Sequence, residues 1–218
     1  MAEGEDRQAL LTALTTEHFT LQGARSQTVS ESAARSALYL GCMSSALIAL
    51  GFVSQVSEGG ELFQLFALAA LPTLYFLGIF TFVRLVETSV EDILYGRAIN
   101  RIRHYYLELA GENGRYFMMS GNDDALGVIS NMGLRPGSRL QLFFTAASAV
   151  SVVNGMVGAS AVAILLGVTL DLPLACAAIA GAAFLVASVW LHMRYDRSHH
   201  EAAGGHREVL FPSSAAAG

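Results

Sequence analysis

The amino-acid sequence predicts an all-α integral membrane protein: a four-helix bundle made of two hairpins, with a helical cytoplasmic layer. The chain has 218 residues, of which 53% are hydrophobic and only 14% are charged, against about 25% charged residues in soluble domains. Its mean hydropathy is +0.47. Four runs have the ~20 apolar residues that a membrane-spanning helix needs. This composition argues against a soluble enzyme, a disordered chain and a nucleic-acid-binding protein.

The four expected spans lie at about residues 38–56, 62–83, 140–168 and 172–193. The second contains Pro72, and none carries an acidic or basic side chain in its interior. A charge at the centre of a bilayer costs at least ~2.5–3.5 kcal/mol, so uncharged runs of this length indicate spans. The spans form two expected transmembrane hairpins, residues 38–83 and 140–193.

The arginines predict the orientation of the spans. All 13 basic residues are arginine, and they lie before the first span, between the second and third, and after the fourth. The short connectors 57–61 and 169–171 have none. Positive residues stay on the cytoplasmic side, so we expect a multi-pass protein of a bacterial inner membrane with both termini in the cytoplasm.

The N-terminal arm, residues 1–35, is predicted to be a cytoplasmic helix. No proline occurs between Met1 and Val56, so the arm and the first span can form one long helix, with a possible kink at Gly23. One face of it carries small or polar residues that suit either close packing against another helix or a wet, pore-facing stripe. These residues are Gln22, Ser26, Ser30, Ala33, Ala37, Gly41 and Ser44.

The central cytoplasmic segment, residues 84–139, is predicted to be largely helical. Residues 84–110 have apolar positions at steps of three and four and continue from the second span. A short helix is expected after Asn122-Asp123-Asp124, which form a good N-terminal cap, and Gly133 is a good stop. Because adjacent carboxylates point apart on a helix, we expect capping and neither a metal site nor a cofactor. Residues 194–218 are expected to be a disordered cytoplasmic tail.

Two sets of residues are candidates for function. The first lies mainly in the third span, around the intramembrane amide of Asn154, and either packs helices together or lines a pore. It consists of Asn154, Ser148, Ser151, Gly155, Gly158 and, in the first span, Ser44. The second set could bind a soluble partner or anionic lipid headgroups, or be a solvated helix face. It consists of Arg97, Arg101, Arg103, His104, Tyr105 and Tyr106.

Two runs of sequence, residues 16–22 (TEHFTLQ) and 99–108 (INRIRHYYLE), resemble those of uncharacterised bacterial four-pass membrane proteins. The similarity covers most of the chain up to residue 195. It implies a fold and a membrane location, and no activity comes with it.

The functional expectation is an oligomeric, channel-like membrane protein gated from the cytoplasmic side. Catalysis is not expected, because the chain has no GxSxG motif of serine hydrolases, no Walker motif and no zinc-binding HExxH motif. It also has no paired intramembrane aspartates. The expected partners are membrane lipid and further copies of the chain. The alternative is a non-transporting scaffold whose cytoplasmic helices bind a soluble protein or anionic lipid.

Overall fold

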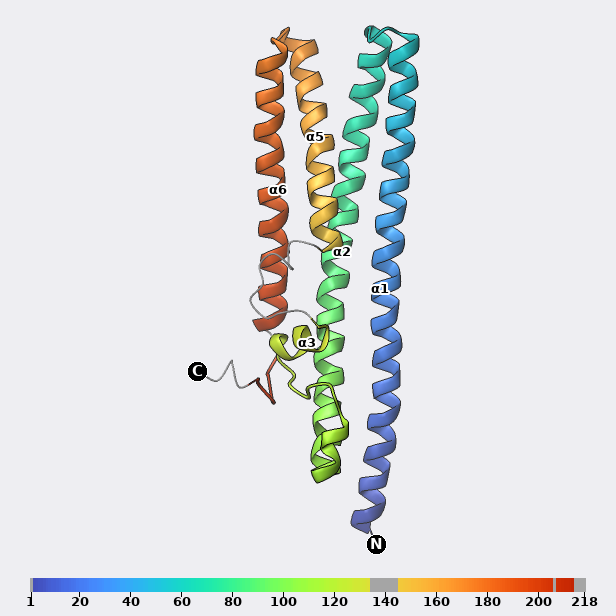
Figure 1. The fold of residues 1–218 in the computed structure, drawn as a ribbon, viewed down its shortest axis with the longest axis vertical. Coiled ribbons are helices and arrows are strands. Elements are labelled where there is room, and N and C mark those ends of the chain that lie inside the picture. Colours follow the sequence, from blue (N-terminus) through green and yellow to red (C-terminus); the bar gives the residue numbers. More distant parts are fainter. Residues whose placement is uncertain (1, 134–144, 206, 214–218) are drawn as a thin grey trace. The chain divides into compact units, whose positions relative to one another are not determined.

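The computed structural model describes residues 2–133, 145–205 and 207–213, and within these residues it is all-helical with no strand. The long helices are α1 (Ala2–Val56), α2 (Glu61–Ala110), α5 (Ala146–Leu170) and α6 (Leu174–Gly205). Along the chain, a 3-10 turn η1 (Gly111–Tyr116) and a short helix α3 (Ala125–Asn131) follow α2 and precede α5. Figure 1 shows α3 beside α2. The all-α expectation is confirmed. The four long helices are long and apolar enough to cross a membrane.

The ends of the helices follow local sequence. The arm and the first span form the single helix α1, as the absence of proline predicted, and Gly23 does not interrupt it. Helix α2 runs on past Pro72 and stops before Gly111, whose φ of +53° is a left-handed conformation that favours glycine. The Thr145 hydroxyl caps α5 by accepting from the Ser148 amide at 3.1 Å. The beginning of the expected third span, residues 140–144, lies outside the described residues.

The expectation of a disordered tail from residue 194 is wrong. Helix α6 continues to Gly205, and residues 207–213 make hydrogen bonds to the segment that precedes α3. The helix continues because residues 194–203 contain neither proline nor glycine, which are the usual helix breakers. Residues 206 and 214–218 lie outside the described part of the chain.

Contacts divide the chain into two units. We call one the polar unit; its described residues are those up to 31, from 88 to 133, and from 200 onward. We call the other the apolar unit; its described residues are 32–87 and 145–199. Helices α1, α2 and α6 contribute residues to both.

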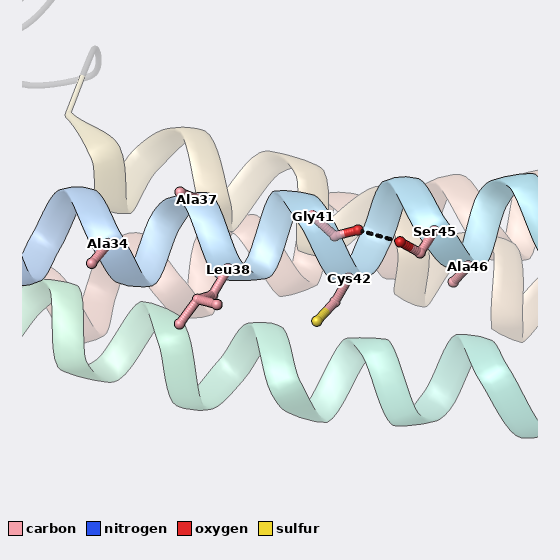
Figure 2. A pocket seen from close by; sticks show the side chains of 7 residues that line it. All are labelled: Ala34, Ala37, Leu38, Gly41, Cys42, Ser45 and Ala46. Atoms are coloured by element: carbon pink, nitrogen blue, oxygen red, sulfur yellow. Dashed lines mark hydrogen bonds between the residues drawn. The ribbon is translucent and has the colours of Figure 1, made fainter.

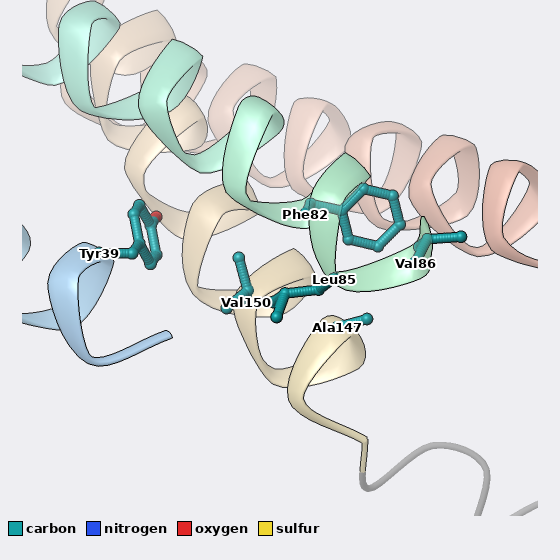
Figure 3. Packing of buried hydrophobic residues seen from close by; sticks show 6 residues of the cluster. All are labelled: Tyr39, Phe82, Leu85, Val86, Ala147 and Val150. Carbon is teal, nitrogen blue, oxygen red and sulfur yellow. The ribbon is translucent and has the colours of Figure 1, made fainter. Parts of the chain in front are cut away.

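The interior of the apolar unit holds two clusters of buried side chains. In the first, Tyr39 of α1, Phe82 of α2 and Val150 of α5 are members of one buried cluster (Figure 3). Its other buried members are Leu85, Val86 and Ala147. Tyr195 of α6 packs against this cluster. The second cluster consists of Leu50, Ala67, Leu71, Leu74 and Val157. Residues from all four long helices therefore meet in this unit.

Glycines bring the helices of the apolar unit close together. A Cβ added at Gly78 of α2 would lie 2.0 Å from the Asn154 Oδ1 of α5. A Cβ added at Gly158 of α5 would lie 2.4 Å from the Phe184 ring of α6 and 2.7 Å from the Tyr75 ring of α2. These contacts leave no room for even a methyl group. Small residues between membrane helices act in this way, because they let the backbones approach closely.

The polar unit is organised around α2. Val128 of α3 is buried with Ile99 and Ile102 of α2, and a Cβ at Gly96 would lie 2.7 Å from Val128 Cγ1. The arm of α1 is joined to α2 by the Arg25 guanidinium, which donates to both Asp92 carboxylate oxygens at 2.8 and 3.1 Å. Such bidentate pairs fix orientation as well as adding attraction.

We expect Gly78→Ala to destabilise the protein by roughly 1–3 kcal/mol, because the added methyl group overpacks the contact with Asn154. The matched control is Gly51→Ala in α1, where an added Cβ meets nothing within 4 Å. Thermal unfolding in detergent measures both. Equal melting temperatures for the two variants would contradict the close approach of α2 and α5.

Candidate functional site

The amide of Asn154 lies at a junction of three helices of the apolar unit. Its side chain is fully buried, and its Oδ1 accepts a hydrogen bond of 3.2 Å from the Tyr39 hydroxyl of α1. Gly78 of α2 lies directly against the same amide. The Nδ2 group has no hydrogen-bond partner among the described residues, and an unmet buried donor of this kind costs about 1–3 kcal/mol.

The other candidates in the third span lie mostly beside Asn154, between helices of the same chain. Ser151 is buried. Gly155 lies against Leu185 and Gly158 against Phe184, both in α6. Ser148 is half-buried near the beginning of α5 and contacts Thr145. Gly155 and Gly158 therefore lie at contacts between helices of the same chain.

Ser44 is separate from that group. It is exposed on α1, and its hydroxyl donates to the Leu40 carbonyl of its own helix at 2.8 Å. The same outward side of α1 forms a shallow groove with small side chains, and the Ser45 hydroxyl donates to the Gly41 carbonyl there at 3.0 Å (Figure 2). The groove is lined by Ala34, Ala37, Leu38, Gly41, Cys42, Ser45 and Ala46.

A second group of hydrogen-bonded polar residues in the apolar unit includes His192, which was not among the candidates from the sequence. The Tyr75 hydroxyl lies 3.0 Å from the Ser188 hydroxyl, and His192 Nδ1 lies 2.6 Å from the Ser188 carbonyl oxygen. The His192 ring also packs edge-on against Phe82 with ring centroids 4.4 Å apart. His192 comes one residue before the expected end of the fourth span, so its position gave little sign of burial.

The arginines proposed as a partner surface contact the protein's own chain. Arg97 is buried, and its Nε donates to the Asp123 carbonyl at 2.7 Å while Nη2 donates to the Arg207 carbonyl at 3.1 Å. The Arg101 Nε and Nη2 both donate to Asp123 Oδ2, at 2.8 and 2.6 Å. Its Nη2 also donates to the Glu208 carbonyl at 2.7 Å.

The remaining members of that set are engaged or half-buried too. Arg103 donates to Asn100 Oδ1 at 2.8 Å. The His104 ring stacks on the Phe211 ring with centroids 3.6 Å apart. Tyr106 donates to the Thr15 hydroxyl at 3.3 Å, and Tyr105 is half-buried. These side chains hold the polar unit together, which leaves less of their surface for a partner than the sequence suggested.

Asp123 and Asp124 hold residues 207–213, which we call the C-terminal segment. Asp123 is fully buried and accepts from the Phe211 and Leu210 amides at 2.8 and 3.2 Å. Asp124 accepts from the Ser213 amide at 2.9 Å and from the Ser213 hydroxyl at 2.5–2.6 Å. Asp124 also caps α3 by accepting from the Gly127 amide at 2.7 Å, as its place before the helix predicted.

Both carboxylates are held in the charged form. Burial raises the pKa of Asp123, but hydrogen bonds from the Phe211 amide, Arg101 and the Leu210 amide outweigh that effect and bring it below its ordinary 3.8. Burial likewise raises the pKa of Asp124. Hydrogen bonds from Ser213 and from the Gly127 amide outweigh that effect, so this pKa also lies below 3.8. Among the described residues, no group of three or more metal-ligating side chains gathers here or elsewhere.

The C-terminal segment was missed by the sequence analysis. Its partners lie between 87 and 110 residues away in the chain, and most of its contacts use backbone atoms that no motif records. One signal was present: Phe211 and Pro212 are bulky residues in a stretch otherwise rich in glycine, serine and alanine.

Comparisons with protein-family models, with curated proteins and with solved structures find no match to this chain. The resemblance to bacterial four-pass membrane proteins therefore stays a prediction.

We expect Tyr39→Phe and Asn154→Ala to be coupled, because the Tyr39 hydroxyl is the donor to the Asn154 amide. A double-mutant cycle on unfolding in detergent should give a coupling of about 0.5–1.5 kcal/mol, the range for hydrogen bonds between membrane helices. Ser44→Ala is the control, since its hydroxyl bonds only within α1. Fully additive effects would show that the Tyr39–Asn154 bond contributes nothing.

We expect acid to release the C-terminal segment. With the segment docked, the pKa of Asp123 and that of Asp124 lie below 3.8, in part through hydrogen bonds from Phe211, Leu210 and Ser213. The stabilisation from those bonds is therefore present above about pH 4 and is lost as the pH falls through the lower, docked pKa values. The amide resonance of Phe211 in protein labelled with 15N-phenylalanine follows this change. A resonance that stays unchanged down to the pH at which the whole protein unfolds would contradict it.

Proposed function

We propose that the protein is an oligomeric, channel-like membrane protein in which copies of α1 face one another around an axis. The four long helices would cross a bacterial inner membrane as one bundle. The arginine distribution favours an orientation with both termini and the polar unit in the cytoplasm. From there, movement of α1 and α2, which continue into the polar unit, would open and close the pore.

The observation that carries this proposal is the outward side of α1. In the most apolar window of α1, 11% of the residues are buried, against 17% in α6 and 33% in α2 and in α5. A Cβ added at Gly41 meets nothing within 4 Å. The backbone at Gly41 therefore faces open space within the described chain.

Small side chains on an exposed membrane helix favour another helix over lipid. Without a hydrophobic driving force, helices in bilayers associate where small residues let backbones approach. From Gly23 to Ser44 the exposed positions of α1 at steps of three and four are small for more than five turns, whereas exposed positions beside this row carry large apolar side chains such as Val29 and Leu40. The small positions are Gly23, Ser26, Ser30, Ala34, Ala37, Gly41 and Ser44.

The same face gives α1 a polar edge that can meet water. Ser44 and Ser45 use their hydroxyl hydrogens on carbonyls of their own helix, which leaves the oxygen lone pairs free to accept from water. Between Arg35 and Glu58 the helix has no acidic or basic side chain. A pore lined by this face would therefore select weakly among ions. Asn154 and Ser151 lie inside the chain, so we assign the lining to α1 and not to α5.

The alternative, a scaffold without transport, is favoured by one observation in the polar unit. The loop after α2 exposes large apolar side chains: Met118 is 91% exposed and Tyr116 is 74% exposed. Exposed apolar groups gathered in this way mark protein-binding surfaces. The loop replaces the arginine set as the surface on which a soluble partner would bind.

Cys42 provides the test, because it is a free, exposed cysteine in the groove of α1. In the Cys176→Ser protein, whose only cysteine is Cys42, we expect membrane-permeant oxidant to form disulfide-linked dimers, since disulfides need Cα atoms within about 7 Å. In liposomes we expect this protein to conduct ions and a small, water-soluble, cationic thiol reagent to reduce the flux.

The matched control is Cys42→Ser, which leaves only Cys176, exposed on α6. We expect neither dimers nor a change in flux on treatment of this variant. The scaffold would be supported if Cys42 forms dimers but the protein conducts no ions and Cys42 does not react with the water-soluble reagent. Absence of dimers in both variants would contradict contact between copies of α1.

A further inference from the structure

The C-terminal segment is bound without regular secondary structure, and its backbone bends at Arg207, Leu210 and Phe211. Its backbone carbonyls accept from the polar unit at three residues: Arg207 from Arg97, Glu208 from Arg101, and Phe211 from the Asp123 amide. Its backbone amides donate at Leu210 and Phe211 to the Asp123 carboxylate and at Ser213 to the Asp124 carboxylate. Six backbone groups in seven residues are thus matched by a donor or acceptor.

Two side chains of the segment add recognition. The Phe211 ring stacks on His104 with an interplanar angle of 13°, and the Ser213 hydroxyl donates to Asp124. Pro212 lies between them, at the one position from 210 to 213 whose backbone nitrogen has no hydrogen to donate. By contrast, the side chains of Val209 and Leu210 are 38% and 47% exposed.

The receiving side is built independently of the segment. Arg97 and Arg101 lie one helical turn apart on α2, and His104 follows a further three residues along. The stretch that carries Asp123 is held on α2 by the Asn100 amide, which donates to the Asn122 carbonyl at 2.8 Å. Asn131 Nδ2 of α3 donates to Asn100 Oδ1 at 2.9 Å. None of these bonds to Asn100 involves residues 207–213.

We propose that Arg97, Arg101, His104, Asp123 and Asp124 form a peptide-binding site, and that the chain's own C-terminal segment is its reversible ligand. The site takes a short peptide with an aromatic residue followed two positions later by a hydroxyl residue. Phe211 and Ser213 meet this requirement. The segment lies on the surface, with exposed side chains at Val209, Leu210 and Pro212, so it can leave without unfolding the helices beneath it. This inference does not depend on the proposed pore.

The first measurement is hydrogen exchange of the full chain in detergent, read by mass spectrometry over residues 207–213. We expect the amides of Leu210, Phe211 and Ser213 to be protected relative to the free peptide. Removing the two side-chain contacts of the segment, with Phe211→Ala and Ser213→Ala together, should speed their exchange at least about tenfold, equivalent to about 1.4 kcal/mol. Glu208→Gln is the matched control within the segment, because Glu208 binds Arg101 through its carbonyl only.

Changes on the receiving side should have the same effect. Asp123→Asn removes the charge that holds two segment amides. Asp124→Ser removes the acceptor of Ser213, and serine still caps α3, so that the helix is retained. Glu112→Gln, at an exposed position of η1, is the control for a lost negative charge.

The second measurement adds a fluorescent synthetic peptide of residues 207–213 to the full chains. The Phe211→Ala, Ser213→Ala chain has a weakened ligand and an intact site, so we expect saturable binding. We expect at least about tenfold weaker binding to the unaltered chain, whose own segment competes at an effective concentration near 1 mM. We also expect at least about tenfold weaker peptide binding to the chain that carries Asp123→Asn together with Phe211→Ala and Ser213→Ala.

Two results would overturn the proposal. One is exchange at residues 210, 211 and 213 of the unaltered chain as fast as in the free peptide. The other is peptide binding that is absent up to about 1 mM in the Phe211→Ala, Ser213→Ala chain, or equal in all three chains. Neither readout uses ion flux, so failure here and failure of the proposed channel are separate outcomes.

Discussion

The structure depends on one constraint, which is that backbone polar groups in an apolar surrounding must be satisfied within their own segment. Helices meet this constraint by themselves, and the chain meets it with four long ones whose hydrogen bonding runs on past the apolar stretches. Once the backbone is satisfied, the remaining problem is the side-chain polar groups. The chain places few of them in the apolar unit, and the Asn154 amide is held by Tyr39 and enclosed by Gly78.

The two units use different means of holding helices together. In the apolar unit, close contact replaces hydrophobic attraction: Gly78, Gly155 and Gly158 let α5 lie against α2 and α6. In the polar unit, arginine and carboxylate groups make the contacts, as in the Arg25–Asp92 and Arg101–Asp123 pairs. The absence of lysine fits this use, because a planar guanidinium can serve a carboxylate and a carbonyl together, as Arg101 does.

Much of the fold could be predicted from the sequence, because helix length, proline placement and capping are local properties. The continuity of α1, the end of α2 at Gly111 and the cap at Asp124 all follow from a few neighbouring residues. Asn154 could be recognised as a special residue, since an amide at membrane depth needs a partner, but its partner Tyr39 lies 115 residues away. The docking of the C-terminal segment could not be predicted, because backbone groups supply six of its bonds and the bulky residues Phe211 and Pro212 do not by themselves indicate a partner.

The short connection between α6 and the C-terminal segment limits how far the end of α6 can move while the segment is docked. Gly205 ends α6 and Arg207 begins the segment, so two residue steps of at most about 3.8 Å each join them. While the segment is docked, the Cα atom of Gly205 therefore stays within about 8 Å of the Cα atom of Arg207. Any larger movement of that end must first break the bonds that the Arg207 and Glu208 carbonyls accept from Arg97 and Arg101, so the docked segment restricts the movement of α6.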